Sequence, residues 1–184
     1  MPLELHDTIA AVASPSDPAP RGIVRISGER TVDVVAQVFH PTASDSNSED
    51  WQRSRMPVRI EGHIALPTIG TPLPAALMLW PTARSYTGQP MAEIHTIGAP
   101  PLLGAVLERL FECGARSANR GEFTMRAFLA GRIDLVQAEA VLGVIDAADH
   151  EELKTALTQL GGGITSKLGA VRNEILSLLG DLEA

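Results

Sequence analysis

The sequence contains little cysteine and few aromatic residues. Its 184 residues include a single cysteine, Cys113, and only 4% Phe, Trp and Tyr. One cysteine cannot form an intrachain disulfide and is too few for a cysteine-rich metal centre, so both kinds of site are excluded. Cys113 stands at the end of an apolar segment, and we therefore expect a buried, inert thiol.

The sequence also lacks a secretory or membrane-spanning segment. No N-terminal stretch combines basic residues with an apolar run, as a secretory signal does. No apolar run approaches the ~20 residues that cross a bilayer. We expect a cytoplasmic protein that makes no contact with a membrane.

Basic residues are outnumbered by acidic ones. The chain has 15 Lys and Arg against 22 Asp and Glu, a net charge of −7. Nonspecific nucleic-acid binding depends on a surplus of basic side chains, and the chain as a whole has none. Arg116, Arg120, Arg126 and Arg132 form a local exception, opposed only by Glu122. This cluster is either a solvated helix face or a site for an anionic ligand or partner.

The first two thirds of the chain alternate between strand and helix patterns. The 45% hydrophobic content is sufficient for a folded core. The segment 15–21 contains three prolines and is expected to be a loop, and the polar segment 42–55 is expected to be a mobile surface loop. Short runs rich in β-branched residues predict strands, and apolar residues at helical spacing predict helices. The expected strands are 7–14, 22–27, 58–66, 75–80 and 92–96, and the expected helices are 27–39 and 101–113, the latter stopped by Gly114.

From Glu122 onward the pattern is helical throughout. Asp134 is expected to cap a helix over 135–147. A last helix is expected from His150, with apolar residues at heptad spacing as far as Leu182 and a kink at the glycines 161–163. This seam has no closing cap, so we expect the chain to be a fragment of a longer protein. The segment 161–168 lacks the residue order of a P-loop, so the chain is not expected to bind GTP by that route.

The segment 121–140, GEFTMRAFLAGRIDLVQAEA, is more specific than helical periodicity requires. It resembles the GEFT-to-QAEA segment of the tRNA modification GTPase family called MnmE or TrmE. Three earlier blocks are also similar to that family and occur in its order. These are DTIAAVASP at 7–15, GIVRISG at 22–28, and SYTG at 85–88 followed by AEIH at 92–95.

The resemblance implies an α+β fold with two domains. Residues 1–118 would form a mixed-sheet, folate-binding and dimerising domain that is similar to the aminomethyltransferase of glycine cleavage. Residues 119–184 would begin an all-α helical domain, incomplete here, into which the family inserts its GTPase domain. The family binds a tetrahydrofolate derivative, in its 5-formyl or 5,10-methylene form, as a one-carbon donor. Its full-length members hydrolyse GTP with K⁺ and Mg²⁺, and modify the wobble uridine of tRNA with a flavoprotein partner, MnmG (GidA).

Transferred by motif position, the folate contacts of the family fall on Arg25, Glu93 and Arg132, the last where the family usually has Lys. A carboxylate such as Glu93 can accept hydrogen bonds from adjacent pterin N–H groups. A guanidinium can hold a carboxylate or a ring oxygen with two parallel bonds. Each residue also has a plainer interpretation. Arg25 can be a strand-edge charge, Glu93 a solvent-facing residue, and Arg132 a cation at a helix end.

The sequence departs from the family pattern in its loops. The segment 17–20 reads Asp-Pro-Ala-Pro where the family is glycine-rich, Gln89-Pro90 replaces an acidic pair, and 95–100 has lost a His and a Gly. Two alternatives therefore remain: a folate-dependent aminomethyltransferase-like enzyme, and a structural dimerisation module whose site has decayed. No second His or Cys stands at ligand spacing from His95, so we expect no metal there.

Overall fold

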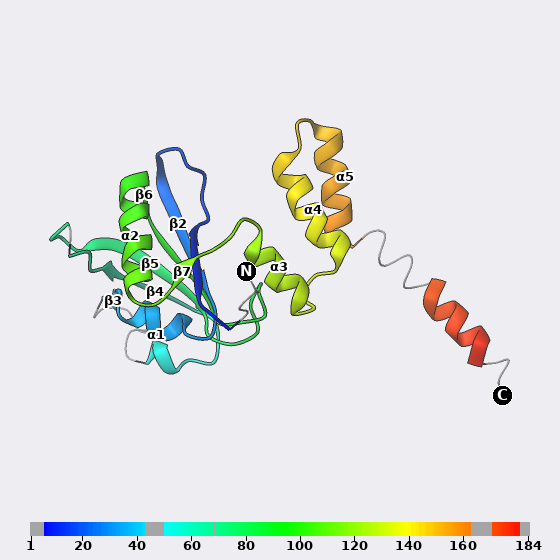
Figure 1. Ribbon diagram of the computed structural model, residues 1–184, viewed down its shortest axis with the longest axis horizontal. Helices are drawn as coiled ribbons and strands as arrows, with labels where there is room; N and C mark the ends of the chain where they lie inside the picture. Colours follow the sequence, from blue (N-terminus) through cyan, green and yellow to red (C-terminus); the bar gives the residue numbers. More distant parts are fainter. Residues whose placement is uncertain (1–5, 43–49, 68, 163–170, 181–184) are drawn as a thin grey trace. The chain divides into compact units, whose positions relative to one another are not determined.

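The structure, a computed structural model, describes residues 6–42, 50–67, 69–162 and 171–180 (Figure 1). It divides into two compact units, Met1–Ala127 and Phe128–Ala184. Each unit is described by itself. In the described residues, no helix is both long and apolar enough to cross a membrane.

A mixed seven-stranded sheet organises the first unit. Its spatial order is β3-β4-β5-β6-β2-β1-β7, and its pairs are antiparallel except for the parallel pair of β1 and β7. The strands are β1 Ile9–Val12, β2 Ala19–Ser27, β3 Phe39–Pro41, β4 Val58–Ile64, β5 Leu73–Trp80, β6 Met91–Gly98 and β7 Arg116–Ser117. With its helices, this sheet confirms the predicted α+β class.

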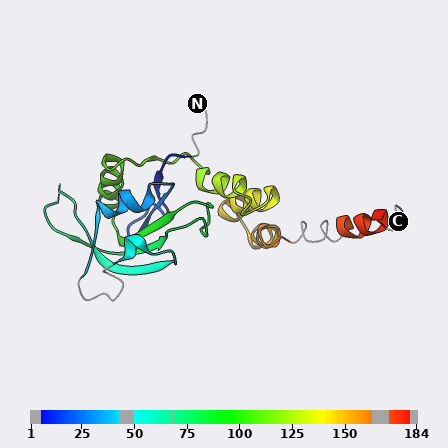
Figure 2. The same ribbon diagram turned by 90° about the horizontal axis from the view of Figure 1, so that it is seen from below.

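Two helices, α1 Thr31–Ala36 and α2 Pro100–Glu112, cover one face of the sheet (Figure 2). Side chains alternate across each strand, so every second residue of the central strands points to this face. The core there is formed by Val24 and Ile26 of β2, Ile94 of β6 and Leu77 of β5, all fully buried. The intervening residues point to the opposite face, where most side chains are only partly buried.

Several boundaries differ from those the sequence predicts. β2 begins at Ala19, inside the expected proline loop, because Ala19 pairs with Gly98 of β6. A Cβ on Gly98 would lie 2.7 Å from the Ala19 carbonyl oxygen, so only glycine permits this close approach. The predicted helix 27–39 is reduced to α1, because Phe39 joins the edge strand β3 opposite Ile64.

The predicted surface loop 42–55 is wrong at Trp51. Residues 43–49 lie outside the described part of the chain, but Trp51 begins a short 3₁₀ turn, η1 Trp51–Arg53. Its side chain is buried and packs edge-to-face on Phe39, with ring centroids 6.2 Å apart. A single large aromatic residue is enough to draw a polar segment onto the core.

The end of α2 agrees with the prediction. Cys113 is buried, and Gly114 follows with φ of +102°, a conformation that side chains disfavour. The strand β7 after it was not predicted, because two residues are too few for a periodic pattern.

The second unit contains α4 Leu135–Asp146 and α5 His150–Leu160. Asp134 caps α4 as predicted, in a reciprocal capping box with Gln137. The predicted last helix is interrupted at the glycines where a kink was expected, because α5 ends at Leu160 and Gly162 has φ of +78°. Residues 163–170 lie outside the described part, and residues 171–180 form a separate helix whose side chains are exposed.

An ion-pair network centred on the buried side chains of Glu122 and Arg126 joins Asp7 to α3, Glu122–Leu129. The carboxylate of Glu122 accepts two hydrogen bonds from Arg116, at 2.7 and 2.9 Å, and one from Arg126, at 2.9 Å. Arg126 also donates to the Asp7 carbonyl oxygen at 2.8 Å and to Gln89 Oε1 at 3.0 Å. Asp7 itself forms ion pairs with both arginines.

This network changes the interpretation of the arginine cluster. Arg126 and Glu122 are each about 2% exposed, so they belong to the interior and not to a solvated helix face. The bonds from Arg116 lower the pKa of Glu122 from 4.5 to about 2, against the opposing effect of burial. The same pairing raises the pKa of Arg116.

We predict that Glu122→Gln destabilises the first unit by about 3 kcal/mol, because it removes the buried negative charge that pairs with both Arg116 and Arg126. The pKa of Glu122 is depressed on folding. Its contribution is therefore present above about pH 4.5 and lost as the pH falls towards about 2. Urea unfolding between pH 7 and pH 3 measures both effects, and the variant should lose part of the acid dependence. Glu108→Gln, on the exposed side of α2, is the control and should change stability by less than about 0.5 kcal/mol.

Candidate functional site

The sheet brings two of the three predicted site residues together. Arg25 lies on β2 and Glu93 lies directly opposite it on β6. Both point away from the face that α1 and α2 cover, because their neighbours Val24 and Ile94 are buried in the core. A third polar residue, His95, follows on the same face of β6, opposite Ile23.

Glu93 is the centre of this cluster. Its Oε1 accepts hydrogen bonds from Arg25 Nε at 2.9 Å and from Arg25 Nη2 at 2.7 Å. Its Oε2 lies 3.2 Å from His95 Nε2. The side chains of Glu93 and His95 are 13% and 12% exposed, and that of Arg25 is 32% exposed. The plainer interpretation of Glu93 as a solvent-facing residue is therefore wrong.

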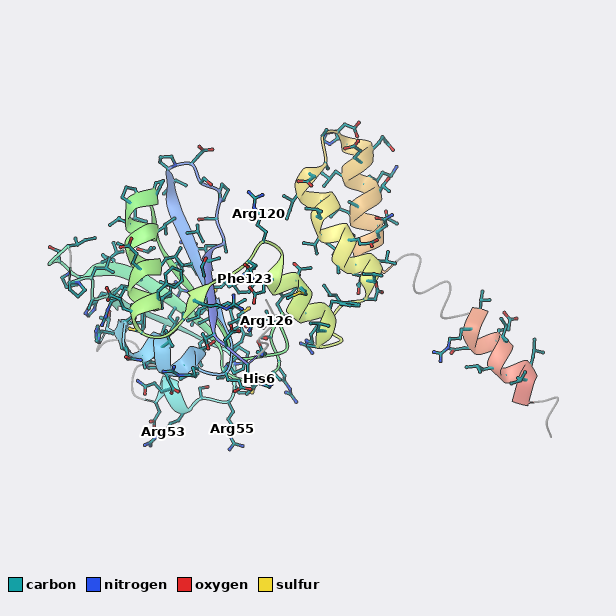
Figure 3. All side chains as sticks on the ribbon, viewed as in Figure 1. His6, Arg53, Arg55, Arg120, Phe123 and Arg126 are labelled. Atoms are coloured by element: carbon teal, nitrogen blue, oxygen red, sulfur yellow. The ribbon has the colours of Figure 1, made fainter. Side chains whose placement is uncertain are left out.

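Helix α3 supplies an aromatic ring to the cluster. Arg25 Cζ lies 5.7 Å from the centroid of Phe123, within range of a cation–π interaction. Phe123 follows Glu122, so the ion-pair network that fixes α3 also fixes this ring. Figure 3 labels Phe123 and Arg126, which lie on this helix near the strands. Tyr86 holds the same helix from the SYTG block, donating to Thr124 Oγ1 at 3.1 Å.

Buried hydroxyl groups connect the SYTG block to the end of β2. Ser27 Oγ lies 2.6 Å from Thr87 Oγ1, and Thr31 donates to the Pro90 carbonyl oxygen at 3.1 Å. Ser85 donates to the Gln89 carbonyl oxygen. The Gln89-Pro90 pair, which departs from the family pattern, thus takes part in internal hydrogen bonds.

Arg132 belongs to the second unit, where it is exposed and lies between α3 and α4 in the sequence. A hollow of about 270 Å³ lies on the uncovered face of the sheet in the first unit, and His95 is one of its lining residues. In the described part of the chain, no group of three or more His, Cys, Asp and Glu side chains gathers as metal ligands would.

Sequence reasoning missed His95 and Phe123 as members of the cluster. His95 could have been found, because strand alternation places it on the same face as Glu93, two residues away. The position of Phe123 had no sequence signal, because it depends on how α3 docks against the sheet.

We predict that Glu93→Gln lowers the free energy of unfolding by no more than about 1 kcal/mol, because an ion pair with a partly exposed partner contributes little to stability. Urea unfolding beside Glu122→Gln, where about 3 kcal/mol is expected, makes the comparison. An equally large loss in both variants would mean that the Arg25–Glu93 pair is a structural anchor and not a ligand-binding group.

Comparison with known proteins identifies the family of the chain. A family described as "GTP-binding protein TrmE N-terminus" matches residues 8–132, which include Arg25, Glu93 and Arg132. A tRNA modification GTPase MnmE from Rhodopirellula baltica is 50% identical, over 100% of this chain and 38% of its own length.

Two further relatives carry the same name. One from Thermus thermophilus is 37% identical, over 99% of this chain and 41% of its own length. One from Heliobacterium modesticaldum is 39% identical, over 97% of this chain and 38% of its own length. The chain therefore spans about two fifths of the relatives it matches. It belongs to the TrmE N-terminus family, and it corresponds to part of the proteins called tRNA modification GTPase MnmE.

Proposed function

We propose that this chain binds a tetrahydrofolate derivative, in its 5-formyl or 5,10-methylene form, and forms a homodimer through its N-terminal domain. The observation that carries the proposal is the Arg25–Glu93 pair, which lies on the sheet face opposite α1 and α2, beside Phe123 of α3. Family membership favours the same ligand, because the folate contacts of the family fall, by motif position, on these two residues and on Arg132.

The chemistry of the cluster fits a pterin ring. Glu93 uses both lone pairs of Oε1 for Arg25, and one of Oε2 for His95. A ligand that donates two hydrogen bonds to this carboxylate therefore displaces one of its partners, and Arg25 is the more exposed of the two. Arg25, once displaced, can donate to a ring oxygen or a carboxylate of the ligand with its fork geometry. Phe123 offers an apolar ring beside this position.

The whole protein, in this proposal, is a cytoplasmic tRNA modification GTPase. It adds a carboxymethylaminomethyl-type group to the wobble uridine of tRNA together with the flavoprotein MnmG (GidA). GTP, K⁺ and Mg²⁺ are bound by a part of the protein outside this chain. We retain the proposed division into a folate-binding domain over 1–118 and the start of a helical domain over 119–184.

We predict saturable binding of 5-formyltetrahydrofolate in a calorimetric titration of this chain. Arg25→Ala and Glu93→Gln should each weaken binding about tenfold or more, because each removes charge-assisted hydrogen bonds. Arg132→Ala tests the third contact in the same way. Arg55→Ala, an exposed residue of the first unit (Figure 3), is the control and should leave the affinity unchanged.

A folded wild-type chain that binds no folate would contradict the folate proposal. That result would favour a structural dimerisation module whose site has decayed. Arg25 and Glu93 would then pair only with each other and would hold no ligand.

We predict that light scattering gives a mass twice the 19.5 kDa of the chain. Two copies of one domain bury a shared surface in such a dimer, so the mass should stay constant on moderate dilution. A mass of one chain at all concentrations would contradict dimerisation through this part of the protein.

A further inference from the structure

Two histidines face each other at the edge of the sheet, apart from the Arg25–Glu93 cluster. β3 is the edge strand, and its only sheet neighbour in the described structure is β4 (Figure 1). His40 of β3 lies directly opposite His63 of β4 in the antiparallel register. Opposed residues of paired strands point to the same face. Phe39 and Ile64, which neighbour them, are buried in the core, so both imidazoles lie on the uncovered face.

The distance between the two rings suits a shared metal ion. Their centroids are 5.5 Å apart, with an angle of 35° between the ring planes. An imidazole that binds Zn²⁺ at ~2.1 Å places its ring centre roughly 3.2 Å from the metal. Centres 5.5 Å apart then correspond to an angle of roughly 120° at the ion, close to tetrahedral.

Among the described residues, no third His, Cys, Asp or Glu side chain joins the two histidines as a metal ligand. Glu61 lies two residues before His63 on the same face of β4, but its carboxylate is paired with Arg59. Thr42 lies opposite Glu61, where its backbone N–H donates to the Glu61 carbonyl oxygen at 2.9 Å. His40 is exposed and His63 is half-buried, so an ion can reach both rings from solvent.

We propose that His40 and His63 form a surface site for a divalent transition-metal ion of the class that prefers imidazole, such as Zn²⁺. The ion joins the edge strand β3 to β4 by a link that the backbone ladder does not supply. Three residues of β3 pair with β4 in that ladder. Because the ladder is short, a metal link would strengthen the attachment of β3 to the sheet. The site is separate from the Arg25–Glu93 cluster and independent of the proposed folate binding.

The test is a calorimetric titration of the full chain with Zn²⁺ in a chelator-free buffer, with ¹⁵N NMR of the histidine side chains. We expect one ion per chain, and signals of His40 and His63 that shift together. His40→Gln and His63→Gln should each weaken binding at least about tenfold, since each removes one of two protein ligands. His150→Gln, an exposed single histidine on α5, is the control and should bind Zn²⁺ as the wild type does.

The melting temperature gives a second measurement of Zn²⁺ binding, which the wild-type chain and each variant report separately. Zn²⁺ should raise the melting temperature of the wild-type chain and of His150→Gln, but not that of the double variant His40→Gln/His63→Gln. The proposal is overturned by absence of saturable binding to the wild type, by unchanged binding to a folded double variant, or by a shift of only one of the two histidines.

Discussion

The buried carboxylate of Glu122 is the group on which the arrangement of the first unit depends. It receives Arg116 from the β7 strand and Arg126 from the next turn of its own helix. Arg126 in turn binds the backbone and the side chain of Asp7, just before β1. Two carboxylates and two guanidinium groups thus connect three segments of the chain. A buried charge network of this kind is destabilising unless every member is paired, which fixes its geometry.

The position of the candidate site follows from that network. α3 is held at its first turn by Glu122, and the next residue places its ring over Arg25. The β2–β6 register then sets Glu93 opposite Arg25, and His95 approaches the second oxygen of the carboxylate. The cluster is therefore built from the sheet and one helix, with little contribution from loops. The substituted segment at 17–20 does not disturb it, because its residues from Ala19 onward are part of β2.

Much of the sheet could be predicted from the sequence, and the reasons are local. β4 alternates apolar and polar residues over seven positions, and β5 is a continuous run of eight apolar residues, so the positions of both strands could be read from the sequence. The ends of α1 and α5 could not be predicted from the sequence. Phe39 fits the helical pattern but pairs with Ile64 in the sheet. The apolar pattern of α5 continues past Leu160, but the helix ends there, at the glycines. Arg126 and Asp7 pair across a sequence separation of 119 residues, and no local sequence pattern predicts that contact.

The candidate site, too, could be predicted only in part from the sequence. Resemblance to the family named Arg25 and Glu93, but only the register of β2 and β6 shows that they lie opposite each other on one face of the sheet. From residue type alone, the cluster with Arg116 and Arg126 could be a solvated helix face or a site for an anionic ligand or partner. The burial of Arg126 with Glu122 shows that an arginine in a basic stretch of sequence can still have an acidic partner inside the fold.

The central claim is that Arg25 exchanges its partner when folate binds, while the arginines of the buried network do not move. Nitrogen-15 NMR of the arginine side chains during addition of 5-formyltetrahydrofolate tests it most directly. The account predicts that the Arg25 Nε–H signal shifts with saturation, and that the signals of Arg116 and Arg126 stay in place. An Arg25 signal that does not change while the ligand saturates the chain would contradict it.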